Sequence, residues 1–213
     1  MPVFVDATAV AGLSHVYEGG EAYVVGGGVA AFDCNGDALP ELAIAGAEAP
    51  FAMFLNTGRA GRPPAYERME DVLGAPLEGT TGAYPLDFDG DGTLDLFVLR
   101  FGRNLALRGL GDCFFEDATD DLGLPEAEDW STAFAATWEA GRDLPTLFVG
   151  NYVPRDRPLQ ERENCEASYV LRGEGGAYGA PISTGQGACT LSALFLDWSG
   201  SGQIDLRLAN DRE

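Results

Sequence analysis

The chain has 213 residues, of which 46% are hydrophobic and 10% aromatic, and its 34 Asp and Glu against 13 Lys and Arg give a formal net charge of −21. This is the composition of a globular protein and excludes a disordered chain. The negative field makes nucleic acid and anionic membrane surfaces poor partners. No apolar run approaches the roughly 18 residues of a membrane span, so no membrane insertion is expected. The first eleven residues do not resemble a signal peptide, which leaves an intracellular protein or one whose signal has been removed.

The expected elements begin with a strand over residues 4–8, F-V-D-A-T. A small apolar strand (26–32, type A) leads into an acidic loop at 33–41, and an apolar strand (42–45, type B) follows it. Residues 54–57 form the next expected strand (type C), and a faint copy of the F-x-D-A-T segment (type D) starts at Tyr66. This order of four strand types defines the first repeat.

The same order recurs along the chain. Repeat 2 has an A strand at 82–86, an acidic loop at 87–95, and B, C and D strands at 96–99, 105–108 and 115–119. Repeat 3 has strands at 132–137, 147–150, 169–172 and from Tyr178, around a degenerate loop at 137–146 that keeps the Gly and Leu-Pro of loop 1 but few carboxylates. Repeat 4 has strands at 192–196 and 206–209 around a loop at 197–205. The period is about 55 residues.

Short strands separated by Gly-rich turns predict an all-β fold, and four antiparallel strands per repeat are typical of a β-propeller blade. We therefore expect a single domain over residues 1–213 with about four blades, the last one incomplete because it lacks a C strand. Three arrangements stay open: residues 4–8 join the last blade, a second copy completes the ring as a homodimer, or the sequence is part of a longer propeller.

The acidic loops read D-x-[DNS]-G-[DS]-x-x-x-[DE]. Side-chain oxygens at positions 1, 3, 5 and 9 and a backbone carbonyl at position 7 form the oxygen-only ligand set that Ca²⁺ prefers. Without a cation, two carboxylates about 4 Å apart repel by up to about 4 kcal/mol at an effective dielectric of about 20. An EF-hand is excluded, because its position 12 needs a Glu and here holds Ile44, Val98 and Leu208. The alternative is a set of Asp/Gly turns without an ion, which is strongest where Asn35, Ser199 and Ser201 replace carboxylates.

The pattern F-x-D-A-T…G-G-G-x-A-x-x-D-x-N-G-D-x-x-x-E-L, with its copies from Phe4 to about Asp211, resembles the FG-GAP/VCBS repeat family, and within it the cartilage acidic protein group and its bacterial relatives. The resemblance implies an integrin-α-like propeller, calcium in the A–B loops, extracellular or periplasmic residence, and a role in cell adhesion or protein binding. It implies about three Ca²⁺ sites, whose ligands are Asp33, Asn35, Asp37, Leu39, Glu41; Asp87, Asp89, Asp91, Thr93, Asp95; and Asp197, Ser199, Ser201, Gln203, Asp205. The chain departs from the family in its degenerate loop around Glu139, expected to hold no ion, in the serines of loop 4, and in lacking the further blades and the C-terminal domain common in the family.

The topology gives an expectation for the four cysteines. Cys165 lies in a B–C connection and Cys189 in a D–A connection, on the face opposite the acidic loops, which predicts a disulfide between them. Cys34 and Cys113 lie on the other face but in different repeats, so we expect them to be free thiols.

The sequence lacks a nucleophile elbow, a phosphate-binding loop and a zinc-ligand spacing, and the single histidine, His15, is expected to be an ordinary loop residue. We therefore expect a non-enzymatic scaffold whose protein or glycan partner meets the loops opposite the acidic face, which hold His15, Trp130 and residues 152–157. The alternative is a calcium-dependent carbohydrate-active enzyme, a polysaccharide lyase or hydrolase, built on the same fold. Glu126, Glu128 and Asp129 are expected to be a solvated loop.

Overall fold

A computed structural model describes residues 3–70, 72–73, 75–156, 165–185 and 187–211. The described elements are strands, apart from one short 3₁₀ helix at Glu21–Tyr23. The first sheet has the order β1-β2-β3-β4, with every neighbouring pair antiparallel. Its strands are β1 (Val29–Phe32), β2 (Glu41–Ile44), β3 (Ala52–Asn56) and β4 (Tyr66–Arg68). The A-B-C-D order expected for repeat 1 is therefore observed.

Repeat 2 forms the same antiparallel meander. Its strands are β5 (Thr80–Leu86), β6 (Asp95–Gly102), β7 (Leu105–Gly111) and β8 (Phe114–Asp117). The end of β6 also pairs with the start of β9, at Phe101 opposite Trp130, and this joins repeats 2 and 3 into one sheet.

Repeat 3 contains β9 (Asp129–Thr137), β10 (Thr146–Asn151), β11 (Tyr169–Leu171) and β14 (Ile182–Ser183), paired in that order, with a small hairpin of β12 (Gly173–Glu174) and β13 (Ala177–Tyr178). The D strand expected from Tyr178 is thus split between β13 and β14. Repeat 4 contributes β15 (Thr190–Leu196) and β16 (Asp205–Asn210), which pair with each other. The all-β class and the antiparallel pairing are confirmed.

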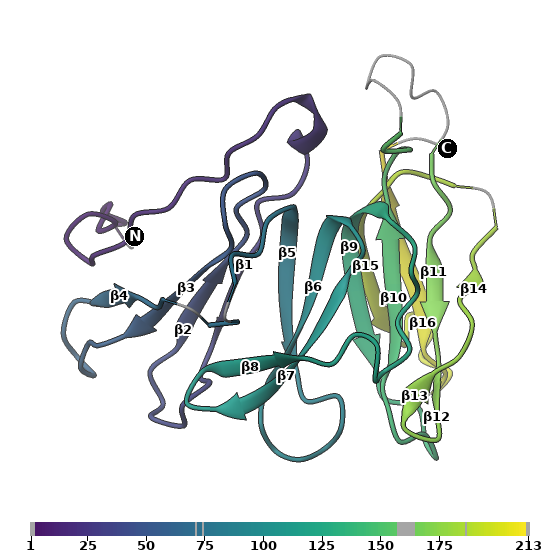
Figure 1. The fold of residues 1–213 in the computed structure, drawn as a ribbon. Coiled ribbons are helices and arrows are strands. Elements are labelled where there is room, and N and C mark those ends of the chain that lie inside the picture. The colour runs from purple at the N-terminus through teal and green to yellow at the C-terminus, as the bar shows by residue number, and fades with distance from the viewer. Residues whose placement is uncertain (1–2, 71, 74, 157–164, 186, 212–213) are drawn as a thin grey trace.

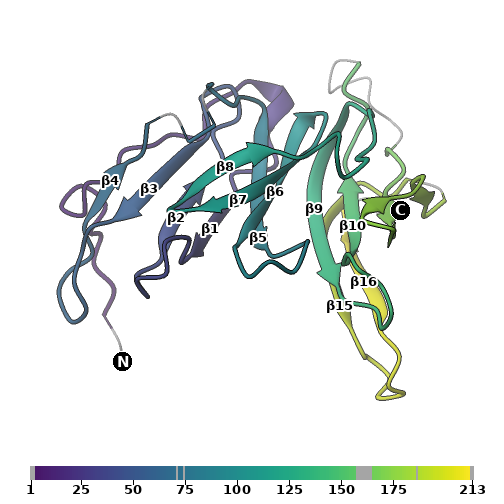
Figure 2. The same cartoon turned by 60° about the horizontal axis from the view of Figure 1, so that its bottom comes forward.

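Figures 1 and 2 show repeats 1, 2 and 3 side by side in chain order, and the β15–β16 sheet of repeat 4 lies against β9 and β10 of repeat 3. The A strands of successive repeats are directly linked. Gly28 N donates to Thr81 O (3.1 Å), Thr81 Oγ1 to Ser131 O (2.6 Å), and Thr132 Oγ1 to Thr190 O (2.5 Å). At Gly150 in β10, a Cβ would lie 2.7 Å from Ala133 Cβ, so this close approach needs glycine.

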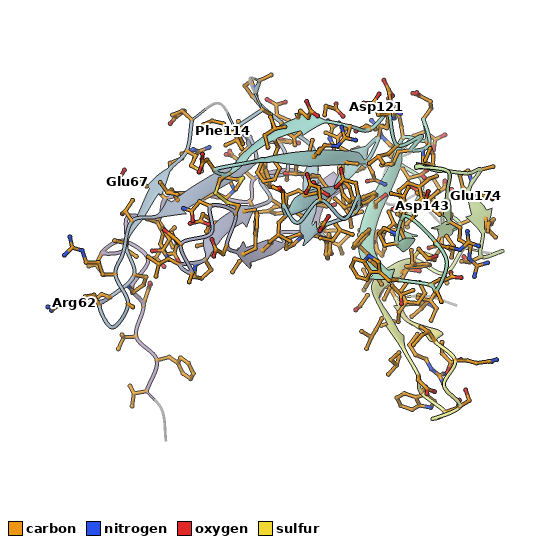
Figure 3. The ribbon with its side chains drawn as sticks, turned by 90° about the horizontal axis from the view of Figure 1, so that it is seen from below. Arg62, Glu67, Phe114, Asp121, Asp143 and Glu174 are labelled. Atoms are coloured by element: carbon orange, nitrogen blue, oxygen red, sulfur yellow. A yellow bond between two sulfur atoms is a disulfide. The ribbon has the colours of Figure 1, made fainter. Side chains whose placement is uncertain are left out.

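The core lies between successive sheets, and β6 shows why its sequence is apolar at consecutive positions. Leu96 and Val98 pack into a cluster with β1, β2 and β3, whereas Phe97 and Leu99 pack into a second cluster with β10 and β11. Because successive residues of a strand face opposite sides, a strand covered on both faces reads as a continuous apolar run. In Figure 3 side chains fill the space between the sheets, while Arg62 and Asp121 lie at the periphery.

Two expectations about strands and surfaces are wrong. Residues 4–8 form no strand, Phe4 is 91% exposed, and the segment that follows lies beside β4, where Tyr66 N donates to Ala11 O. Trp130 and Tyr152 belong to the core, with 0% and 6% of their surface exposed, because they pack together with Phe101 and the Cys165–Cys189 region. They cannot serve as surface contacts for a partner. Residue 157 lies outside the described residues.

Two further expectations concern single residues. His15 is a loop residue whose Nε2 lies 2.9 Å from Ala45 O, which ties the N-terminal segment to the end of β2. Asp129 is half-buried and belongs to β9, so it is not part of a solvated loop. Among the described residues, no helix has the length and apolar character needed to cross a membrane.

Candidate metal centre

The three acidic loops share one backbone turn, built by the aspartate at position 1. Its carboxylate accepts hydrogen bonds from backbone N–H groups three to five residues later, a local side-chain-to-backbone pattern that closes the turn. The distances are 2.7 Å for Gly36 and 2.8 Å for Ala38 to Asp33, 2.7 Å for Gly90 and 3.0 Å for Gly92 to Asp87, and 3.0 Å for Ser201 and 2.7 Å for Gly202 to Asp197. The turn therefore forms from the chain's own donors.

Glycine at position 4 makes this turn possible. Gly36, Gly90 and Gly200 have φ values of 79°, 76° and 71°, in the left-handed region that side chains disfavour. The residues at position 7 follow an equally regular pattern: the N–H groups of Leu39, Thr93 and Gln203 each donate to the side chain at position 5. The backbone at position 7 is therefore anchored to position 5 in the same way in the three loops.

Loop 2 gathers the most carboxylates. One oxygen each of Asp87, Asp89 and Asp95 lies within 4.8 Å of the other two. Asp95 at the start of β6 is fully buried and accepts N–H groups from Phe88 and Gly109, both at 2.8 Å. The pKa of Asp95 is raised to about 6, chiefly by burial and to a smaller extent by the negative charges of Asp89 and Asp87, while the two hydrogen bonds act in the opposite direction. A cation at this place would relieve both the burial and the repulsion.

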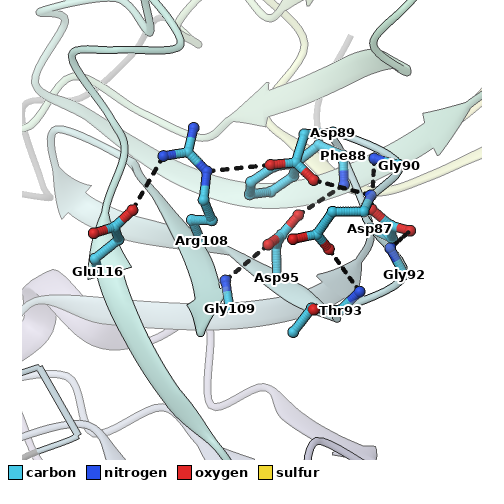
Figure 4. A network of polar contacts seen from close by, with 11 residues as sticks. Asp87, Phe88, Asp89, Gly90, Gly92, Thr93, Asp95, Arg108, Gly109 and Glu116 are labelled. Carbon is cyan, nitrogen blue, oxygen red and sulfur yellow. Dashed lines mark hydrogen bonds and ion pairs between the residues drawn. The ribbon is translucent and has the colours of Figure 1, made fainter. Parts of the chain in front are cut away.

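The fourth carboxylate of loop 2, Asp91, lies outside this group and is exposed. Figure 4 shows the network around the loop, including Arg108 of β7. Its Nε lies 3.2 Å from Asp89 Oδ2 and its Nη1 lies 3.1 Å from Glu116 Oε1. The carboxylate oxygens keep free lone pairs beside these bonds, so the arrangement fits a hard cation held by Asp87, Asp89 and Asp95.

Loop 1 is arranged differently around its last carboxylate. Glu41 is fully buried, and its Oε2 accepts the Cys34 N–H (3.0 Å) while its Oε1 accepts the Asn56 N–H (3.4 Å). One oxygen of Glu41 lies within 4.8 Å of the sulfur atoms of Cys34 and Cys113. Among the described residues, Asp33 and Asp37 do not form a group with Glu41 as close as that of Asp87, Asp89 and Asp95. Loop 1 has the turn but a looser ligand set.

Loop 4 offers the fewest charges. Asp197 builds the turn, Ser199 and Ser201 are exposed, and Asp205 at the start of β16 is half-buried. Two carboxylates remain where loop 2 has four. We rank the three predicted sites by fit in the order loop 2, loop 1, loop 4.

The degenerate loop 3 has exchanged carboxylates for cationic side chains. Glu139 accepts from Thr146 Oγ1 at 2.6 Å and forms ion pairs with Arg172 Nε at 3.0 Å and Arg142 Nε at 3.5 Å. These interactions lower the pKa of Glu139, the Thr146 hydrogen bond most. Sequence reasoning did not assign these arginines a role. For Arg172 the signal was the Leu-Arg pair that ends both C strands, at 105–108 and 169–172.

Both cysteine pairs form disulfides. The predicted Cys165–Cys189 bond is present with a Cα–Cα distance of 4.8 Å. The expectation of free thiols at Cys34 and Cys113 is wrong, because these residues are bonded with a Cα–Cα distance of 4.9 Å. Loop 1 of repeat 1 and the β7–β8 turn of repeat 2 contribute to one buried cluster, so cysteines of different repeats meet there.

Comparison with known proteins bears on the same region. None of the curated proteins compared with the chain matches it. Residues 33–98, which include acidic loops 1 and 2, match the model of the FG-GAP-like repeat family. This match supports a relationship of the chain to the FG-GAP repeat proteins.

Proposed function

We propose that the chain is a calcium-binding, non-enzymatic scaffold of β-propeller-type repeats that forms one domain and serves protein binding or adhesion outside the cytoplasm. The observation that carries the calcium site is the convergence of Asp87, Asp89 and Asp95 on one point, with Asp95 fully buried. A buried carboxylate beside two others is costly unless a cation compensates it. The recurrence of the same turn in loops 1 and 4 supports up to three sites.

The extracellular or periplasmic location is supported by the two disulfides, because such bonds persist in oxidising compartments. The FG-GAP-like match supports a binding or adhesion scaffold. The proposed partner is a protein or glycan. Nucleic acid is disfavoured by the net charge of −21.

A second copy of the chain is one such partner. In repeats 1–3 the B strand pairs with a C strand, whereas in the described residues β16 pairs with β15 alone. Leu194 and Ile204 of repeat 4 are 58% and 56% exposed, and Trp198 is 66% exposed. An unpaired strand edge beside apolar side chains favours strand addition. We therefore propose that a homodimer can complete this sheet.

The experiment that tests the calcium proposal is isothermal titration of the metal-free protein with Ca²⁺, and with Mg²⁺ as the competing hard cation. Asp87→Asn removes one carboxylate of loop 2, and Glu67→Gln removes an exposed carboxylate of β4 as a matched control. We expect Ca²⁺ binding that Asp87→Asn weakens and Glu67→Gln leaves unchanged. Equal titrations for all three proteins would contradict the proposal.

Chelation supplies the stability readout. For sites with a Kd of about 10⁻⁴–10⁻³ M, each bound ion adds about 0.4–1.4 kcal/mol at 1 mM Ca²⁺. For a domain of this size this corresponds to a rise in Tm of about 1–5 °C per site. A melting curve that does not respond to chelator would contradict calcium-linked stability.

The alternative of a carbohydrate-active enzyme is tested in parallel. A polar cleft of about 460 Å³ beside loop 3 contains Glu139, Asp143 and Glu174 together with Arg142. Turnover of acidic polysaccharides that is lost in Asp143→Asn or Glu174→Gln would favour the enzyme. Absence of turnover with and without Ca²⁺ would favour the scaffold.

A further inference from the structure

One position of the C strand differs between repeats in a way that matches the charge of the neighbouring loop. The strand register defines this position, because the first B-strand residue after each loop faces an equivalent C-strand residue. The facing pairs are Leu42–Phe54, Leu96–Leu107 and Leu147–Leu171. The next C-strand residue is Leu55 in repeat 1, Arg108 in repeat 2 and Arg172 in repeat 3.

In repeat 2 this residue supplies a positive charge to the acidic loop. Arg108 Nε lies 3.2 Å from Asp89 Oδ2, and the two side chains are only 29% and 28% exposed. Partly buried charges are screened less by salt than fully exposed ones. The guanidinium therefore acts on the same carboxylate that is proposed to hold the ion.

In repeat 3, two arginines form ion pairs with one acidic residue of the loop. Arg172 Nε lies 3.0 Å from Glu139 Oε1, and Arg142, at position 5 of the loop where loops 1 and 2 have aspartate, lies 3.5 Å from Glu139 Oε2. Two guanidinium groups here hold Glu139, which stands at position 2 of the loop, next to the predicted ligand positions and not at one of them. Guanidinium is permanently charged, so it can replace a cation as the counter-charge of a carboxylate.

Loops 1 and 2 reach the same net charge with different residues. Loop 1 has three carboxylates, with Asn35 at position 3 and the neutral Leu55 on the C strand. Loop 2 has four carboxylates, with Asp89 at position 3 and Arg108 on the C strand. Asparagine occurs with leucine and aspartate occurs with arginine, and both combinations leave a net charge of −3. Position 3 and the C-strand residue thus form a charge-matched pair.

We propose that Arg108 sets the Ca²⁺ affinity of loop 2 by acting as the internal counter-charge of Asp89. The proposal rests on the calcium site proposed above. A bound divalent ion is repelled by the guanidinium and must share Asp89 with it. The expected penalty is about fivefold in Kd, the order of one unit charge acting on a divalent ion across a water-like dielectric.

The test is a double-mutant cycle read out separately at each loop. Ca²⁺ is titrated into the ¹⁵N-labelled full chain, and the amide signals of Gly90 in loop 2 and Gly36 in loop 1 are followed by NMR. We expect Arg108→Leu to lower the Kd at Gly90 about fivefold and Asp89→Asn to raise it. Asp89→Asn/Arg108→Leu, which copies repeat 1, returns the Kd close to the wild-type value. The Kd at Gly36 stays unchanged throughout.

Two further variants act as controls. Arg108→Lys keeps the charge and should keep the wild-type Kd, and Arg108→Gln replaces Arg108→Leu if the leucine variant does not fold. Arg172→Leu should create no Ca²⁺ response at Gly141, because loop 3 lacks the carboxylates of loop 2. The proposal is overturned if removing the Arg108 charge leaves the Kd at Gly90 unchanged or raises it, which would mean that Arg108 only positions Asp89.

Failure of the calcium site gives a different result. If the Gly90 signal of the wild type and of every variant ignores Ca²⁺, the proposed function fails at this loop and the inference about Arg108 fails with it. If Ca²⁺ shifts Gly90 only after the arginine is removed, the role of Arg108 is supported and the wild-type calcium site is contradicted.

Discussion

Cys34 in acidic loop 1 is bonded to Cys113 in the β7–β8 turn, and the two residues are 79 positions apart. The bond joins the acidic loop of repeat 1 to repeat 2, because Cys34 follows Asp33 directly and its N–H and Sγ both contact the buried Glu41. The second disulfide, Cys165–Cys189, spans 24 residues. The two bonds therefore constrain the chain to different extents.

Removal of the Cys34–Cys113 bond is expected to destabilise the protein more than removal of Cys165–Cys189. In the chain-entropy model, loops of these lengths contribute about 4.5 and about 3.5 kcal/mol. Cys34→Ser/Cys113→Ser and Cys165→Ser/Cys189→Ser are compared by urea unfolding at fixed Ca²⁺. A larger loss of unfolding free energy for the second variant would contradict this order.

The threonine hydroxyl groups that link the A strands of successive repeats are expected to contribute measurably to the free energy of unfolding. Thr81 is buried and its Oγ1 donates to Ser131 O at 2.6 Å, so Thr81→Val leaves that carbonyl without its donor. We expect a loss of about 1–2 kcal/mol in unfolding free energy, with Thr81→Ser close to the wild type. The equivalent residue of repeat 4 is Leu191, which cannot donate and is 39% exposed. Leu191→Thr is the matched control and should change stability little; a loss equal to that of Thr81→Val would count against the link.

Asp129 gives a pH-dependent prediction. Burial raises its pKa, although the Asn151 hydrogen bond (2.9 Å) and the charge of Arg155 act in the opposite direction. Because the pKa is higher in the folded state, the folded protein loses stability as the pH rises through that value. Asp129→Asn keeps an acceptor for Asn151 and removes the charge. We expect the Tm of Asp129→Asn relative to wild type to be higher at pH 7 than at pH 4.

Three other acidic groups line the same small cleft as Asp129. They are Glu128, which pairs with Arg155 at 2.7 Å, Asp156 and Glu166. All three are present in wild type and variant, so their titration cancels in the difference of Tm values. A pH-independent difference would mean that Asp129 has an ordinary pKa.

The exposed apolar residues of the two-stranded sheet of β15 and β16 in repeat 4 predict self-association. Light scattering on the eluting protein should show a concentration-dependent dimer, which added salt favours because the net charge of −21 repels a second copy. Leu208→Lys on β16, where leucine is 37% exposed, should shift the protein to the monomer. Leu110→Lys, at an exposed position of β7, is the control. A monomer at all protein and salt concentrations would contradict the homodimer proposal.

The sequence by itself determined the repeat and the local structure. Apolar segments on both sides of each D-x-[DNS]-G loop predicted the order of β1 to β4 and of β5 to β8, because strand alternation and glycine turns are local properties. The role of Asp33, Asp87 and Asp197 in building the turns is likewise local, since each acts on residues within five positions.

Only the tertiary structure decided which residues of different repeats meet. Cys34 meets Cys113 because twisted sheets stack face to face, and Trp130 is buried because β6 pairs with β9. Residues 4–8 form no strand, because an isolated extended segment gains ladder bonds only where a sheet edge receives it. The pairing of Arg108 with Asp89 also depends on the register between β6 and β7. Contacts distant in sequence follow from sheet packing, which local pattern does not encode.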